Sequence, residues 1–247
     1  MKTNLNLLLI FLFFFVSCKK EDTTGLTNKV YDNGPLSTGN LNSATPQDAA
    51  PAGTNWSELQ LTNTYIGYSA ESYISADDFI VPSGESWKID SIKTYCYKSG
   101  YTLAVSPVYA TRIRIWKGEP DQVGSVVVVG DTSTNVLKSS TSSKLYRINK
   151  GSNTLTREIW ENTSAFNSAI SLTLIEGVYW LEIVHYAGGG GLTYFPPVTV
   201  VGQLNKSGAN ALQKDRSGGI YTKIKDDEAV QDIPFKMTQE TGVEWAP

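Results

Sequence analysis

The sequence predicts an all-β protein, a jelly-roll-like sandwich of two sheets that forms a single domain. Short segments of alternating polar and apolar residues recur between turn residues, and no segment carries a helical stripe of three turns or more. The chain contains 13 Tyr, 6 Trp and 21 Gly residues, a composition that is typical of secreted β-proteins. So many short strands favour a jelly roll over an immunoglobulin-like fold.

Each strand is predicted from its own pattern. In residues 111–118, Ile113 and Ile115 share one face, and Arg112, Arg114 and Trp116 share the other. Segment 72–81 alternates and ends at a Pro-Ser-Gly turn, while 125–131 is β-branched and ends in Gly-Asp. The remaining predicted strands are residues 87–98, 144–148, 154–160, 170–174, 178–186, 197–203 and 232–237. Between two of them, residues 186–197 contain four consecutive glycines and two prolines, which predict a loop.

The N-terminus reads as a targeting segment. The apolar run of residues 7–16 is too short for a transmembrane helix, which needs roughly 20 residues, but it suits a signal peptide. The sequence Phe15-Val16-Ser17-Cys18 resembles the lipobox of bacterial lipoproteins, which implies that Cys18 is lipidated. Lys20-Glu21-Asp22 resembles the surface-export signal of Bacteroidota lipoproteins. We therefore expect an outer-membrane lipoprotein that faces the cell exterior.

These features divide the chain into four parts. Residues 1–17 are the lipoprotein signal peptide, and residues 18–29 are the lipidated cysteine and a flexible tether. The β-sandwich follows at residues 30–241, and residues 242–247 form a C-terminal tail.

Composition excludes several functions. The formal net charge is −3 and no long basic block occurs, so nucleic acid is not an expected partner. Cys96 is the one thiol besides Cys18, and we expect it to be buried and inert. His185 is the only histidine, which excludes sites with several histidine ligands and leaves little room for a Ser-His-Asp triad. Its place at a predicted strand end favours a structural role.

The chain also resembles an uncharacterised family of secreted bacterial β-sandwich domains. The matching segments occur in the family's order: YDNGPLSTG (31–39), SADDFIVP (75–82), WKIDSI (87–92), RIWKGEPD (114–121), VVGDTSTN (128–135), KLYRI (144–148), TREIW (156–160), EGVYWLEI (176–183), GANALQ (208–213) and IPFKM (233–237). The resemblance implies a compact, jelly-roll-like accessory domain and supplies no catalytic residues.

Asp77 and Asp78 form a candidate calcium site. They lie on opposite faces of an alternating strand, so one carboxylate points inward or along a strand edge, where an uncompensated charge is costly. A structural Ca²⁺ would resolve this, with further oxygen ligands from Asp131 or from residues 226–227. The alternative is that the two carboxylates cap a turn or accept backbone N–H bonds.

Aromatic residues form a candidate ligand site. Trp116 shares its strand face with two arginines, and Tyr186, Tyr194 and Phe195 flank the glycine loop. Rings of this kind can stack on sugars, although a sandwich core also needs many aromatic residues.

A hydrolase that uses two carboxylates is a third possibility. The available glutamates are Glu158, Glu161, Glu176 and Glu182. No pattern pairs Glu182, which lies in mid-strand, with a second acid. We therefore expect a non-enzymatic surface lipoprotein that binds a glycan or a protein. The alternatives are a structural spacer in the envelope and, less favoured, a carboxylate-dependent glycoside hydrolase.

The lipobox interpretation predicts the behaviour of two cysteine variants. Cys18→Ser should abolish incorporation of radioactive palmitate and release the protein from membranes, because residues 19–247 contain no apolar run long enough to span a bilayer. Cys96→Ser should keep both labelling and membrane location and lower stability modestly. Full labelling of Cys18→Ser, or loss of labelling in Cys96→Ser, would contradict the interpretation.

Overall fold

The computed structural model describes residues 27–166 and 172–241, and no helix occurs within these ranges. Cys18 and the predicted signal peptide lie outside them. The strands are β1 (Thr27–Asp32), β2 (Asn55–Glu58), β3 (Tyr68–Ser69), β4 (Tyr73–Lys98), β5 (Val108–Lys117), β6 (Val126–Gly130), β7 (Leu137–Ile148), β8 (Glu158–Ser164), β9 (Thr173–Ala187), β10 (Thr193–Phe195), β11 (Leu212–Asp215), β12 (Thr222–Lys223), β13 (Lys225–Asp226), β14 (Ala229–Val230) and β15 (Phe235–Thr241). The all-β prediction is confirmed.

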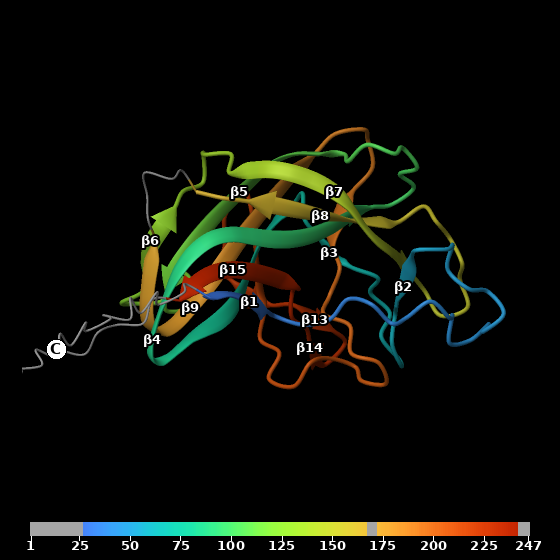
Figure 1. Ribbon diagram of the computed structural model, residues 1–247, viewed down its shortest axis with the longest axis horizontal. Coiled ribbons are helices and arrows are strands. Elements are labelled where there is room, and N and C mark those ends of the chain that lie inside the picture. The colour runs from blue at the N-terminus through green and yellow to red at the C-terminus, as the bar shows by residue number, and fades with distance from the viewer. Residues whose placement is uncertain (1–26, 167–171, 242–247) are drawn as a thin grey trace, which may run out of the picture.

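A single bent sheet forms both layers of the sandwich (Figure 1). All strands except the β13–β14 hairpin belong to one 13-stranded sheet. The first layer has the order β6-β5-β9-β4-β11-β12 and uses the N-terminal part of β4. The second layer has the order β1-β15-β4-β8-β7-β2 and uses the C-terminal part of β4. Strand β4 therefore belongs to both layers.

The change of layer occurs at the turn sequence predicted after residue 81. The β4–β9 register shifts between Val81 and Ser86, and Gly84 between them has φ 76°. A glycine adopts this left-handed conformation without the steric cost of a Cβ atom. The bend brings the two halves of β4 face to face.

Aromatic rings fill the space between the layers. Phe79 from the first half of β4 stacks on Trp87 from the second half, with ring centroids 6.1 Å apart. The same ring lies 5.6 Å from Tyr179 on β9 and 6.2 Å from Phe235 on β15. Ile113 on β5 faces this core, as its alternation predicts. These contacts hold the two layers together.

Several predicted boundaries differ from the structure. Residues 197–203 form no strand, because Pro196 and Pro197 interrupt the backbone and the chain continues as an irregular segment that pairs locally with Pro35 and Asp232. The predicted loop 186–197 contains strand β10, which pairs with β3 and β4. Strand β1 begins at Thr27, three residues before the expected domain start, because residues 27–32 pair with β15. The predicted strand 170–174 lies partly outside the described residues.

Cys96 is a buried free thiol in β4, as expected. Burial raises its pKa to about 12, which keeps it protonated and unreactive. Its sulfur accepts a hydrogen bond from the side-chain amide of Asn162 on β8.

The β5–β6 pairing predicts the effects of two glycine substitutions. Gly130 has φ 84°, and a Cβ atom there would lie 2.0 Å from the main-chain oxygen of Ile113. Gly124 has φ 90°, but a Cβ atom there would meet open space. Both alanine variants carry the left-handed penalty of about 1–2 kcal/mol. Only Gly130→Ala must also displace backbone.

We expect Gly130→Ala to lower the free energy of unfolding by roughly 2 kcal/mol or more beyond the loss in Gly124→Ala. Urea denaturation of both variants measures the difference. Equal losses would contradict the close approach of β6 to β5 at this position.

Candidate functional site

The outer face of the first layer carries the candidate site. On β5 and β9 the apolar residues of each alternation enter the core, so the intervening polar and aromatic residues share the outer face. The cross-strand register places Arg114 opposite Glu182 and Trp116 opposite Trp180. The turn between β11 and β12 packs onto this face through Tyr221.

Glu182 organises one side of the site. It is 2% exposed, and its two carboxylate oxygens accept four hydrogen bonds. Arg114 donates two of them, from Nε at 2.7 Å and Nη2 at 2.8 Å. Trp116 Nε1 and the Tyr221 hydroxyl each donate one at 2.8 Å. Burial acts against the Arg114 charge, but the hydrogen bonds and the charge of Glu182 raise the arginine pKa above its usual value.

Two other arginines share one tyrosine ring. The guanidinium carbon of Arg112 lies 4.5 Å from the ring centroid of Tyr186, and that of Arg216 lies 4.7 Å from it. Arg112 Nη1 donates to the Tyr186 hydroxyl and to the Thr132 carbonyl. Arg216 Nη2 donates to the carbonyls of His185 and of a residue before β4. Burial lowers the pKa of Arg216, and the charge of Arg112 lowers it further.

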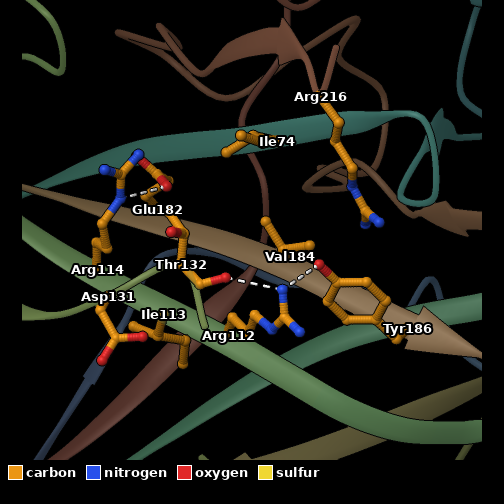
Figure 2. Close-up of a pocket in the computed structure, with 10 residues that line it drawn as sticks. All are labelled: Ile74, Arg112, Ile113, Arg114, Asp131, Thr132, Glu182, Val184, Tyr186 and Arg216. Carbon is orange, nitrogen blue, oxygen red and sulfur yellow. Dashed lines mark hydrogen bonds and ion pairs between the residues drawn. The ribbon is translucent and has the colours of Figure 1, made fainter. Parts of the chain in front are cut away.

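A pocket lies between these two groups of side chains. Its volume is about 290 Å³, and Figure 2 shows the Arg114–Glu182 pair on one side and Arg112, Tyr186 and Arg216 on the other. The remaining lining residues are Ile74, Ile113, Asp131, Thr132 and Val184. The pocket therefore combines an apolar surface, one aromatic ring and several cationic donors.

The structure separates the four predicted ligand residues. Tyr186 lines the pocket, whereas Trp116 is 8% exposed and its ring lies beneath Arg114, at 4.9 Å. Tyr194 stacks on Tyr97 in a different cluster, with ring centroids 5.4 Å apart. Phe195 is completely buried in the core, against His185, and so has no face open to a ligand. Of the four, only Tyr186 lines the pocket, with the guanidinium groups of Arg112 and Arg216 against its ring.

The candidate calcium residues have protein partners. Asp77 points inward and is fully buried, as the alternation of β4 requires for one of the pair. Its oxygens accept bonds from the backbone N–H groups of Asp78 and Ile233 and from the side-chain amide of Asn33. Burial raises the pKa of Asp77, and the charge of Asp232 adds to this rise. Three N–H donors thus occupy the oxygens that a cation would need.

The proposed completing ligands lie elsewhere. Asp226 accepts bonds from Thr64 and Tyr65, while Asp131 bonds to Ser133 and to the residue after it. Within residues 27–166 and 172–241, no group of three or more Asp, Glu, His or Cys side chains could hold a metal ion. Calcium binding stays a prediction.

The four candidate glutamates also have separate partners. Glu161 pairs with Lys93 at 2.6 Å, and Glu176 accepts bonds from the Ser83–Gly84 turn. Glu158 accepts a bond from a serine of β7, and Glu182 belongs to the pocket.

Sequence reasoning missed Arg216. It follows β11 directly, and its position in the pocket depends on the β11–β4 pairing, which joins residues far apart in the sequence. The one local signal is its place before a Ser-Gly-Gly turn, which indicates a turn but no direction.

No protein-family model matches this chain, and a search of curated proteins gave no match either. In the part of the chain that the structure describes, no helix is long and apolar enough to cross a membrane.

The buried Glu182 predicts a large cost for a small substitution. Glu182→Gln keeps the shape but turns one accepting oxygen into a donor, and it leaves Arg114 without its carboxylate. We expect a loss of about 2–4 kcal/mol in the free energy of unfolding. The matched control is Glu161→Gln, a partly exposed pair partner that should lose about 1 kcal/mol or less. Similar losses in urea denaturation would contradict the role of Glu182.

Proposed function

We propose that the protein is a non-enzymatic surface lipoprotein whose sandwich binds a glycan in the pocket on the outer face of the first layer. The pocket beside Tyr186 is the observation that carries this proposal. Its volume of about 290 Å³ is near the lower end of the usual range for ligand pockets, roughly 300–1,000 Å³. That size suits one sugar residue held by polar donors and the apolar lining of the pocket.

The carboxylates of the pocket favour binding over catalysis. A glycosidase needs one carboxylic acid that is protonated at working pH and a second carboxylate at a defined distance. Hydrogen bonds from Thr134 and Ser133 hold the pKa of Asp131 below its usual range. Glu182 already accepts four hydrogen bonds. Neither group is therefore suited to act as a general acid.

The N-terminal sequence supports the cellular setting. A lipidated Cys18 would anchor the chain to the outer membrane, and the residues before β1 would connect that anchor to the sandwich. A spacer needs no ligand, so glycan binding separates this proposal from a purely structural role.

The proposal predicts glycan binding that depends on Tyr186. The lipidated chain, purified in detergent, is applied to a broad glycan array, and each retained sugar is titrated by calorimetry. Tyr186→Ala should weaken binding about tenfold or more, because it removes a side chain that lines the pocket and the ring that positions Arg112 and Arg216. Tyr146→Ala is the control, since this ring packs on Trp56 in the second layer. Retention of no glycan across the array would overturn the proposal.

A further inference from the structure

The pocket holds two cations that lack a carboxylate partner. Arg114 is paired with Glu182, but within the described residues no ion pair involves Arg112 or Arg216. Both guanidinium groups nevertheless lie within 5 Å of the Tyr186 ring centroid. Two like charges held beside one ring repel each other. Burial is the main cause of the lowered pKa of Arg216, and the charge of Arg112 adds to it, while the charge of Glu71 opposes it.

Each of these arginines also has hydrogen-bonding capacity left over. The Nε atoms of Arg112 and Arg216 are buried and have no hydrogen-bond partner in the described part of the chain. A buried N–H group without a partner is destabilising, and more so on a charged group. The bonds that do exist use Nη1 of Arg112 and Nη2 of Arg216, so each guanidinium is fixed in place. Because the Nε atoms are buried, the groups left for a ligand are Nη2 of Arg112 and Nη1 of Arg216.

Within the described residues, no nearby carboxylate forms an ion pair with these two arginines. The charge of Glu71 acts on Arg216, but Glu71 is paired with Lys98 at 3.5 Å. Glu182 bonds to Arg114, and Asp131 bonds to the two residues of its own turn. The whole chain has a formal net charge of −3, so the cationic pocket contrasts with an acidic protein. A local positive site on an acidic surface favours a small acidic group over a long polyanion.

We propose that this pocket recognises the carboxylate of an acidic sugar, a uronic acid residue, through Arg112 and Arg216. The planar guanidinium fork matches the geometry of a carboxylate. The apolar side chains of Val184 and Ile74 supply the surface for the sugar ring, and Tyr186 holds the two arginines beside it. This inference rests on the proposed glycan-binding function and names the class of glycan.

The test compares each uronic acid oligosaccharide with its methyl ester, which keeps the ring and removes the charge. The lipidated chain in detergent is titrated with both forms by calorimetry. The acid should bind about tenfold or more tightly than the ester, and its affinity should fall as salt is raised. Arg112→Gln and Arg216→Gln should each remove this preference, so that acid and ester bind equally.

Three further variants make the test specific. Arg112→Lys and Arg216→Lys keep the charge but lose the fork, so they should restore only part of the preference. Lys223→Gln removes one positive charge from β12 of the same layer and should leave the preference intact. Thermal unfolding of every variant checks that a loss of binding is not a loss of folding.

The possible results separate the two proposals. Equal binding of acid and ester, lost in Tyr186→Ala, would overturn the carboxylate assignment and leave glycan binding standing. Tighter binding of sulfated sugars than of uronates, with the same dependence on Arg112 and Arg216, would also overturn it. Failure of every glycan to bind, together with arginine-dependent binding to vesicles of anionic phospholipid, would overturn both proposals.

Discussion

The buried carboxylate of Glu182 is the interaction on which the outer face of the first layer depends. A charge this deeply buried is tolerated only when its oxygens are fully hydrogen-bonded. Glu182 meets that condition by drawing Arg114 and Trp116 from β5 and Tyr221 from beyond β11. One side chain on β9 thereby holds both strand β5 and the β11–β12 turn. The pocket keeps its shape because this side of it is fixed.

Two other buried charges are stabilised in different ways. Asp77 is surrounded by N–H donors and has no cation bonded to it in the described residues, so burial raises its pKa. Arg147 is 1% exposed, and within the described residues its side chain bonds only to carbonyl and hydroxyl oxygens of Ser57, Ile66 and Thr199. Burial lowers its pKa to about 10. These hydrogen bonds of Arg147 hold irregular segments of the chain against the second layer. Glu182 is the one of the three whose partners include an ion of opposite charge.

Alternation along strands made much of this fold predictable. Ile113 and Ile115 point into the core and Arg112 and Arg114 point away from it, as the alternation of side chains along a strand requires. The bend in the middle of β4 lies at the predicted turn, where Gly84 has a left-handed backbone conformation. Short strands such as β2 and β11 were missed, because they are set by pairing with distant residues and not by local pattern.

The candidate site was predictable only in part, for the same reason. The face that carries Trp116 and the arginines followed from β5 alone. However, the covering of Trp116 by Tyr221 and the arrival of Arg216 depend on how a remote turn folds over the sheet. Phe195 illustrates the opposite error, because a ring next to a glycine loop still entered the core.

The pairing of β1 with β15 has a mechanical consequence. Thr27 lies opposite Thr241, so the described chain begins and ends at one end of the sandwich, close to the bend in β4 (Figure 1). A pull on the N-terminus along the axis of β1 loads the hydrogen bonds of all six paired residues together, in shear, and does not peel them apart one by one. A domain joined to its support through this strand resists a steady drag better than one joined through a loop.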